Sequence, residues 1–251
     1  MFAVKEEKYM DINIILNKKQ MLDQERHSID KITLSSYEKD FELTYTHHST
    51  AIEGNTLTLM ETKVILEDGI SVGGKALREI YEVINHKKAY RYIKKCIEEG
   101  KKLDENIVKD IHQMLTENII AGGIYRNQEV RISGAGHIPP VGTDMFIQIK
   151  NFYADMEWKQ KELNAVEYAA WTHAEFVRIH PFIDGNGRTS RLLMNYQLMA
   201  DGFLPISIAK ENRLEYYNAL EEYAVNKNLD VFVELIADLE EHQLDNYIRM
   251  I

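Results

Sequence analysis

A stretch of twelve residues, HPFIDGNGRTSR from His180 to Arg191, concentrates side chains that a hydrophobic core does not need. It holds a histidine, a carboxylate, two glycines around an asparagine, and two arginines. A histidine can accept a proton, a carboxylate can bind a metal ion, and arginines bind phosphate oxygens. The stretch therefore predicts a site that holds a polyphosphate while a proton is removed from an attacking group.

Each polar residue of the stretch has a chemical interpretation. His180 is interpreted as a general base, which would take the proton of an attacking hydroxyl. Asp184 is a hard oxygen ligand, and Mg²⁺ (or Mn²⁺ in its place) usually takes one or two carboxylates together with substrate phosphates. Arg188 and Arg191 are three residues apart, so they would share one helix face and grip one polyanion. A nucleotide triphosphate with Mg²⁺ fits this set.

The segment from Asp184 to Gly187 is predicted to be a loop that leads into a helix. Glycines let backbone N–H groups approach a phosphate without a Cβ in the way, and the helix dipole adds to the attraction. Taken alone, DGNG is also a common turn, and His180 could be an ordinary loop histidine. The combination of all the polar groups at fixed spacing favours the catalytic interpretation. Phe182 is interpreted as a core anchor that holds the loop in shape.

Helical periodicity dominates the rest of the chain and would supply the scaffold for this loop. In residues 75–100, apolar side chains recur at steps of three and four, and Gly100 ends the run. The candidate helices are 7–25, 36–53, 58–67, 75–99, 104–118, 144–161, 164–179, 188–201, 211–226 and 229–249. The sequence thus predicts a mainly helical, all-α fold.

One segment, residues 122–142, breaks the helical pattern. It holds five of the 13 glycines and two of the four prolines, and Val130 and Ile132 alternate with polar neighbours. This composition predicts one short β-hairpin, or flap. No low-complexity tract marks a linker. The expected organisation is an N-terminal helical region at 1–100 and a core at 104–245.

Bulk composition narrows the classes of partner. The net charge of −10 and the pI of about 5.4 make a nucleic-acid partner unexpected. The single cysteine, Cys96, cannot form an internal disulfide, so the fold needs no oxidising compartment. The first residues lack the pattern of a signal peptide or membrane span. A cytoplasmic location with no membrane partner is expected.

The stretch HPFIDGNGRTSR resembles the signature of Fic-domain proteins, HPFx(D/E)GNGRxxR, at every specified position. YRNQEVRISGAGHIPPVG is similar to the flap of that family, and LLMNYQLMADGFLP to the segment that follows its signature. The resemblance implies a Fic fold and a protein adenylyltransferase, an enzyme that transfers AMP from ATP to a protein hydroxyl and releases pyrophosphate.

Residue by residue, the resemblance implies His180 as the base and Asp184 as the Mg²⁺ ligand. The implied phosphate-binding residues are Gly185, Asn186 and Gly187, in an anion hole, with Arg188 and Arg191 on the outer phosphates. The implied target-docking flap residues, which would pair with an extended segment bearing a Ser, Thr or Tyr hydroxyl, are Val130, Arg131, Ile132, Ser133 and Gly134. Related Doc proteins carry lysine in place of Gly187 and transfer the γ-phosphate, so Gly187 favours AMP transfer.

The expected adenine side departs from the family pattern. Relatives often carry YYxxLxxAN there, whereas this chain has YYNALEEYA, so that Ala224 stands where the family's asparagine lies near adenine. Tyr216 and Tyr217 could border the base, or they could simply pack one face of a helix.

A second stretch, HHSTAIEGN at 47–55, resembles the family's inhibitory signature (S/T)xxxE(G/N) through Ser49, Glu53 and Gly54. The serine and the glutamate are four residues apart, hence on one helix face that the glycine can end. The resemblance implies a brake within the same chain. Glu53 would pair with Arg191, take the cation that should hold the γ-phosphate, and leave ATP misaligned.

Three functions are compatible with these residues. The first is an autoinhibited protein adenylyltransferase that uses ATP and can modify itself. The second is the reverse reaction at the same site, with Glu53 orienting a water that removes AMP from a protein. The third is a nucleotide-responsive interaction module without turnover, although such a module has no use for His180. A homodimer is the mildly preferred assembly.

Overall fold

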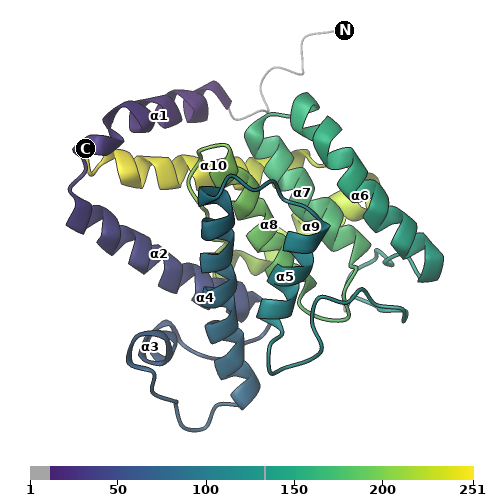
Figure 1. The fold of residues 1–251 in the computed structure, drawn as a ribbon. Coiled ribbons are helices and arrows are strands. Elements are labelled where there is room, and N and C mark those ends of the chain that lie inside the picture. The colour runs from purple at the N-terminus through teal and green to yellow at the C-terminus, as the bar shows by residue number, and fades with distance from the viewer. Residues whose placement is uncertain (1–11, 133) are drawn as a thin grey trace, which may run out of the picture.

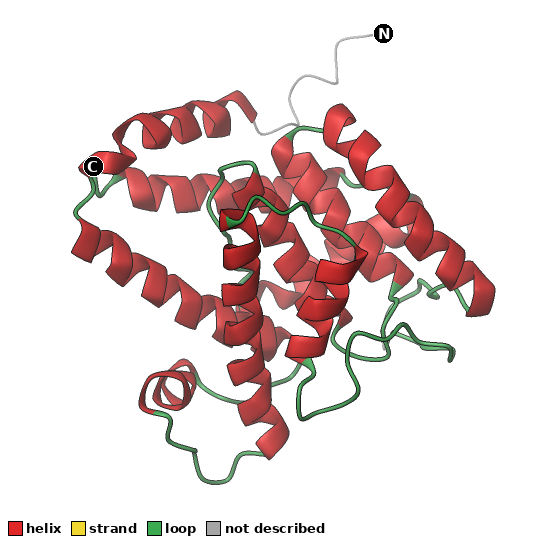
Figure 2. Cartoon of the chain, in the orientation of Figure 1, coloured by secondary structure: helices red, strands yellow, loops and turns green. Residues whose placement is uncertain are grey.

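The computed structural model describes residues 12–132 and 134–251, and within these ranges every regular element is a helix (Figures 1 and 2). The α-helices are α1 Ile12–Glu25, α2 Lys31–Ile52, α3 Leu59–Lys63, α4 Leu77–Glu98, α5 Glu105–Leu115, α6 Gly142–Glu162, α7 Ala165–Ile179, α8 Asn186–Ala200, α9 Arg213–Asn226 and α10 Asp230–Ile248. The short helical turns Arg26–Ser28, Val64–Asp68 and Lys210–Asn212 complete the set. The all-α prediction is confirmed.

Each candidate helix has a counterpart in the described part of the chain, although residues 7–11 of the first lie outside it. The boundaries differ where a cap decides them. Helix α2 begins at Lys31, five residues before the expected start, because the Asp30 side chain accepts a hydrogen bond from Thr33 N. Helix α8 begins two residues early, because Gly185 takes a left-handed conformation and turns the chain at once into the helix.

The predicted β-hairpin is absent among the described residues of 122–142, which form an irregular loop up to the start of α6. Backbone N–H groups of this loop bond to other parts of the molecule instead of to a partner strand. Arg126 N donates to Pro181 O, and Gly136 N and His137 N donate to Glu221. The glycines and prolines of this segment therefore indicate correctly that it is not helical, but they do not predict its structure, because no pair of hydrogen-bonded strands forms among its described residues.

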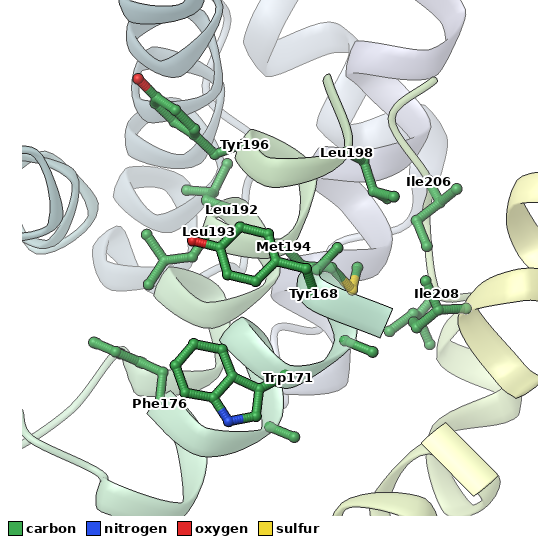
Figure 3. Close-up of a cluster of buried hydrophobic side chains, with 14 of the residues drawn as sticks. Tyr168, Trp171, Phe176, Leu192, Leu193, Met194, Tyr196, Leu198, Ile206 and Ile208 are labelled. Atoms are coloured by element: carbon green, nitrogen blue, oxygen red, sulfur yellow. The ribbon is translucent and has the colours of Figure 1, made fainter. Parts of the chain in front are cut away.

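Helices α7 and α8 pack side by side at the centre of the molecule (Figure 1). Their buried side chains form much of the main core, including Trp171, Phe176 and Tyr196 (Figure 3). The Trp171 ring stacks on that of Phe152 from α6 with centroids 5.4 Å apart. This packing fixes the two helix ends between which residues 180–185 must turn.

The N-terminal helices cover the start of α8. Helices α2 and α4 each contact α8, while α1 packs along α10. Residues such as Ile15, Tyr45 and Ile93 belong to the same apolar core as α7 and α8. Side chains from α2 and α4 can therefore reach the first turns of α8. No helix within the described ranges has the length and apolar character needed to cross a membrane.

Candidate active site

The turn between α7 and α8 carries His180 in a conformation that is uncommon for a residue with a side chain. Asn164 caps the start of α7, and the helix ends when His180 adopts φ 53° and ψ 57°, in the left-handed region. Pro181 has no N–H and cannot continue the helix. Such a conformation costs about 1–3 kcal/mol and persists only where surrounding contacts hold it.

Arg126 supplies many of those contacts. Its side chain is almost fully buried; Nε donates to His180 O at 2.7 Å, and its own backbone N donates to Pro181 O at 2.9 Å. One Nη also donates to Pro140 O at 2.6 Å, which ties the flap segment to the turn. Nothing in the spacing of the sequence indicates this role, because every acceptor is a backbone carbonyl.

Beneath the loop, the rings of Phe182 and His112 stack with centroids 3.6 Å apart and planes 6° from parallel. The anchoring role predicted for Phe182 agrees with its complete burial. His112 Nδ1 accepts a hydrogen bond from Gly123 N at 2.9 Å, so the hydrogen lies on Nε2, which donates to Asp184 O at 2.9 Å. Burial lowers the pKa of His112 to about 4 and keeps the ring neutral.

The Asn186 side chain closes the loop. Its Oδ1 accepts from Phe182 N and its Nδ2 donates to Phe182 O, both at 2.9 Å, in a buried position. Both the oxygen and the nitrogen of the amide are therefore engaged in shaping the loop. The backbone of Asn186, together with those of Gly185 and Gly187, is available for the predicted role in an anion hole.

His180 has the character of a base that is neutral in the free protein. Burial lowers its pKa to about 4, and its Nδ1 is buried without a well-formed hydrogen bond to any described residue. A neutral imidazole can accept a proton at pH 7, as general-base catalysis requires.

Arg191 lies in the interior with all its nitrogen donors engaged. Nε donates to the Ser49 hydroxyl at 3.0 Å, and one Nη donates to Ser49 O at 2.7 Å and to Glu53 Oε1 at 2.8 Å. The other Nη donates to the Tyr216 hydroxyl at 3.2 Å. The arginine is 1% exposed and the glutamate 32%, so the expected Glu53–Arg191 pair exists and is partly desolvated.

Two glycines shape the surroundings of this pair. Gly54, with φ 100°, turns the chain just after α2 and leaves Glu53 at the end of that helix. Gly187 lies directly under the glutamate, because a Cβ at residue 187 would fall 2.2 Å from Glu53 Oε1. The carboxylate therefore occupies space over the first turn of α8.

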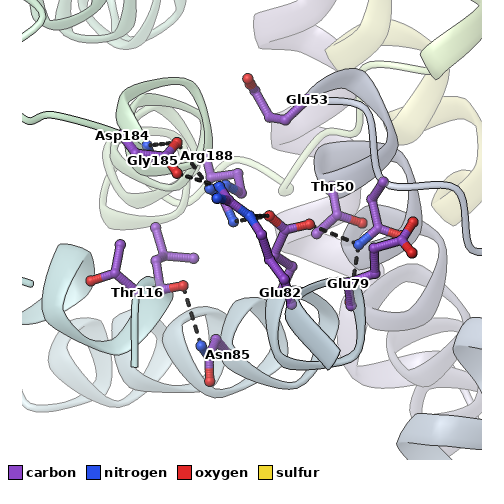
Figure 4. A network of polar contacts seen from close by, with 12 residues as sticks. Thr50, Glu53, Glu79, Glu82, Asn85, Thr116, Asp184, Gly185 and Arg188 are labelled. Carbon is purple, nitrogen blue, oxygen red and sulfur yellow. Dashed lines mark hydrogen bonds and ion pairs between the residues drawn. The ribbon is translucent and has the colours of Figure 1, made fainter. Parts of the chain in front are cut away.

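Arg188 is equally buried but has weaker partners. Glu82 Oε1 and Asp184 Oδ1 each lie 3.4 Å from a guanidinium nitrogen, and Nε has no hydrogen-bond partner in the described part of the chain. Figure 4 shows Arg188 between these two carboxylates. Buried donors without good acceptors fit a site whose anion is supplied by a ligand.

Asp184 is an ionised carboxylate held by cations. Burial acts to raise its pKa, but the charges of Arg188 and Arg78 and the Gly185 N–H outweigh burial and lower the pKa. Arg78, from the start of α4, makes an ion pair with Asp184 and donates from Nε to Glu82 at 3.1 Å. No group of three or more metal-binding side chains exists among the described residues. A single carboxylate beside phosphate-binding groups still fits Mg²⁺, which relies on substrate oxygens and water for its other ligands.

A cavity of about 360 Å³ opens beside these groups. It is lined by His180, Gly187 and Glu53 on one side and by flap and α9 residues, including Glu221 and Ala224, on the other. Of the two predicted adenine-side tyrosines, Tyr217 is 43% exposed and donates to Ile52 O, whereas Tyr216 is buried against Arg191. Tyr217 is thus the better placed of the two to meet a ligand.

Some of the predicted docking residues of the flap lie at this cavity. Val130 and Ile132 are half-buried and Arg131 between them is exposed, so the expected alternation of faces holds over these three residues without a strand, whereas Gly134 is exposed and departs from it. Ile132 and Gly134 line the cavity. Ser133 lies outside the described residues.

Comparison with known proteins places these residues in a recognised context. The model of the Fic/DOC family matches residues 102–198. A protein named Protein adenylyltransferase Fic from Aedes aegypti is 38% identical over 240 residues, covering 91% of this chain and 47% of that protein. Its namesake from Drosophila persimilis is 36% identical over 240 residues, covering 91% and 46%. The chain spans about half the length of these curated relatives.

Solved structures show the same fold. Fic-1 from C. elegans is similar with a TM-score of 0.84 and 29% identity, over 95% of this chain and 72% of that one. A Fic domain containing signaling protein from Bacteroides thetaiotaomicron is similar with a TM-score of 0.85 and 25% identity, over 95% and 96% of the two chains.

Proposed function

This chain carries a Fic/DOC-family domain, and from that premise we propose that it is an autoinhibited protein adenylyltransferase, which transfers AMP from ATP to a hydroxyl of a target protein. One observation carries the proposal. Glu53 reaches over Gly187 to pair with Arg191, and the glutamate lines the same cavity as His180. An inhibitory carboxylate and a base in one cavity are what a braked enzyme requires.

In the reaction, the target hydroxyl oxygen forms a bond to the α-phosphorus of ATP while the bond from that phosphorus to the bridging β-phosphate oxygen breaks. His180 takes the hydroxyl proton, and pyrophosphate leaves. Arg188 and the backbone of the 185–187 turn bind the charged phosphate oxygens. Asp184 would hold Mg²⁺, or Mn²⁺ in its place, which neutralises phosphate charge when bound. For Asp184 to do so, Arg78 must leave the carboxylate.

The brake works by competition for Arg191. While Glu53 holds this guanidinium, the γ-phosphate cannot, and the carboxylate repels the triphosphate. An exposed ion pair contributes only about 0–1 kcal/mol, but breaking a buried one costs about 3–5 kcal/mol. Burial of Arg191 places the pair toward the second case. A triphosphate displaced by about 1 Å can lose about 10²-fold in rate.

The target is proposed to dock along the flap. Residues 130–134 would pair as a strand with an extended target segment and so form the β-structure that the empty flap lacks. The position of Ile132 and Gly134 on the cavity wall supports this placement. The modified residue is then a Ser, Thr or Tyr whose hydroxyl reaches His180, and a neighbouring copy of the chain could present such a residue, giving self-modification.

A second candidate function, removal of AMP from a modified protein, is also compatible with the residues of this site. Glu53 and His180 line one cavity, and the carboxylate is 32% exposed, so it could orient a water toward a phosphodiester. The third interpretation, a nucleotide-responsive module without turnover, has no role for a neutral histidine at the cavity wall.

The deciding experiment incubates the protein, Glu53→Gly and His180→Ala/Glu53→Gly with ATP labelled on the α-phosphate and a cell lysate. We expect weak labelling by the unmodified protein, strong labelling by Glu53→Gly, and none when His180 is also replaced, while ATP still binds. Loss of activity in Glu53→Gly, with release of AMP from pre-labelled proteins by the unmodified chain, would favour the reverse reaction. No turnover by any of them would favour the binding module.

Two further properties belong to the proposal. The protein is proposed to act in the cytoplasm, where its one cysteine, the buried Cys96, would remain reduced. A homodimer is proposed as the assembly that would keep the brake engaged, and sedimentation of the purified protein over a range of concentrations tests it.

A further inference from the structure

The far end of the flap is held by one carboxylate on α9. Gly136 N and His137 N both donate to Glu221 Oε1, at 2.7 Å and 3.1 Å. Two successive backbone N–H groups on one anionic oxygen form charge-assisted hydrogen bonds, which are about twice as strong as neutral ones. The approach is close, since a Cβ on Gly136 would lie 2.8 Å from that oxygen.

A second contact ties the same end of the flap to the helix that carries the base. His137 Nε2 lies 2.8 Å from Arg178 O, two residues before His180. The Arg178 side chain is itself fixed, since it pairs with Glu175 at 2.6 Å, and Glu175 accepts from the Tyr223 hydroxyl of α9 at 2.8 Å. The carboxylate anchor therefore stands on a cross-linked pair of helices, α7 and α9.

The near end of the flap is held by Arg126, which bonds to His180 O and to Pro140 O. The proposed docking residues 130–134 lie between these two attachments. Because the described flap residues form no strand ladder, no regular backbone pairing sets their position. The two attachments must set it.

We propose that Glu221 is a positioning residue for AMP transfer, which fixes the distance between the docking residues 130–134 and His180. This inference rests on the proposed function, because it assumes that a target docks on the flap. Without the carboxylate, Gly136 and His137 lose their shared acceptor, and the far end of the docking segment keeps only the His137–Arg178 O contact and the Arg126–Pro140 O bond. A target hydroxyl displaced by about 1 Å would react about 10²-fold more slowly.

The competing role for Glu221 is contact with the nucleotide, because the residue also lines the cavity together with Tyr217 and Ala224. The two roles predict different losses. A nucleotide contact would weaken ATP binding when removed, whereas an anchor of the flap would slow transfer and leave ATP binding alone.

A first experiment needs no enzymatic activity. Amide hydrogen exchange of the segment around Gly136 and His137 is measured in the unmodified protein, Glu221→Ala and Glu221→Gln. We expect exchange at least about tenfold faster in Glu221→Ala and near the original rate in Glu221→Gln, whose amide oxygen still accepts. The control is Glu222→Ala. Glu222 is the adjacent residue of α9, and its carboxylate accepts a hydrogen bond from Asn226, not from the flap. Unchanged exchange in Glu221→Ala would overturn the anchor.

A second experiment adds the same substitutions to Glu53→Gly and measures transfer of labelled AMP to lysate proteins, with the ATP dissociation constant measured in parallel. Glu221→Ala should reduce transfer by about 10–100-fold with ATP affinity changed less than about twofold, and Glu221→Gln should restore most of it. A loss that follows weaker ATP binding would overturn the proposal in favour of a nucleotide contact.

Gly136→Ala approaches the same contact from the flap side, because its Cβ would collide with the carboxylate. It should slow transfer like Glu221→Ala, and the double variant should lose no more than either single one. Independent, additive losses would contradict a shared contact. If Glu53→Gly itself transfers nothing, the proposed function fails, while the hydrogen-exchange result still decides whether Glu221 anchors the flap.

Discussion

The two arginines of the active-site loop are held by different N-terminal helices and in different ways. On one side, the end of α2 supplies Ser49 and Glu53, which hold Nε and one Nη of Arg191 with contacts of 2.7–3.0 Å. On the other side, α4 supplies Glu82, which approaches Arg188 only to 3.4 Å and leaves its Nε unpaired among the described residues.

Burial does not separate the two sides, because both guanidiniums are almost fully buried and Glu82, at 9% exposed, is more buried than Glu53 at 32%. The α4 side does include an exposed pair, in which Arg78, 54% exposed, links α4 to Asp184. Charges paired in the interior interact strongly, and exposed pairs are screened by water and salt. The comparison teaches that equal burial can go with very different contacts. Arg191 makes short hydrogen bonds to the α2 side, as the proposed brake requires, whereas Arg188 keeps donors that a ligand could use.

The largest difference in AMP-transfer rate should appear when Glu53 on the α2 side and Glu82 on the α4 side are replaced in turn. Glu53→Gly should raise AMP transfer by one to three powers of ten, since each tenfold corresponds to about 1.4 kcal/mol of barrier. Glu82→Gln, with Asn55 and Arg78 still beside it, should change the rate less than about fivefold. Initial rates with labelled ATP measure both. Equal activation by the two substitutions would mean that α4 also carries a brake.

The next effect is on stability. Arg191→Gln removes a buried cation and strands Glu53, Ser49 O and the Tyr216 hydroxyl, so it should lower the free energy of unfolding by about 3–5 kcal/mol. Arg188→Gln should cost only about 1–2 kcal/mol, because its contacts are longer and its acids keep Arg78 as a partner. Urea unfolding of both variants provides the measurement, and similar losses would remove the distinction between the two sides.

The free energy of unfolding should depend on pH through His86. This histidine is fully buried, and its Nδ1 lies within hydrogen-bonding distance, 3.1 Å, of Thr46 Oγ1. Burial, and then the charges of Arg191 and Arg188, lower its pKa well below the ordinary value. As pH falls below about 6.5, His86 therefore binds a proton in the unfolded chain but not yet in the folded one. Protonation favours the unfolded chain, so the stability present above that pH is lost.

Each such histidine can contribute a slope of at most about 1.4 kcal/mol per pH unit below about pH 6.5. Urea unfolding between pH 4.5 and 7.5 should show it, and His86→Gln should reduce the slope by up to that amount, while the contributions of His112 and His180, whose pKa burial also lowers, remain. His242→Gln, at a ring exposed to solvent, is the control and should leave the slope as it was. If the slope of the unfolding free energy against pH is unchanged in His86→Gln, then groups other than His86 cause it.

The smallest effect concerns the metal ligand. Arg78→Gln removes an exposed ion pair worth about 0–1 kcal/mol from Asp184, so the Mg²⁺ concentration that gives half-maximal ATP binding should fall by at most about fivefold. Binding of Mn²⁺ in the presence of ATP, followed by its paramagnetic signal, gives a readout independent of turnover. Arg91→Gln, at another exposed arginine of α4, breaks a pair with Glu42 of α2 and is the matched control. A raised requirement would mean that Arg78 helps to bind the nucleotide.

The sequence predicts the central loop well because its functional groups lie within twelve residues and their order fixes their neighbours. The helices are predictable for a similar reason, since apolar spacing and caps such as Asp30 act over a few residues. The ion pair between Glu53 and Arg191 joins residues 138 positions apart, and only the resemblance to a family signature predicts it.

Other partners leave no trace in the spacing. Arg126 works through backbone carbonyls, His112 through a ring stack and two backbone groups, and Glu221 through two backbone amides. Because any residue supplies such backbone groups, no pattern of residue types marks them. Glycine and proline show that the flap is not helical, but the anchors that replace a hairpin depend on tertiary packing.

The proposed brake and the loop from His180 to Arg191 also constrain each other's evolution. A Cβ at residue 187 would lie 2.2 Å from Glu53 Oε1, so a side chain there would displace the carboxylate from its present position. Positions 53 and 187 are far apart in the sequence, yet under the proposed function a change at the second would also change regulation. A lineage that keeps this arrangement of the glutamate is expected to keep the glycine. One that loses the glutamate first is free to place a side chain on this turn and to explore a different phosphate chemistry.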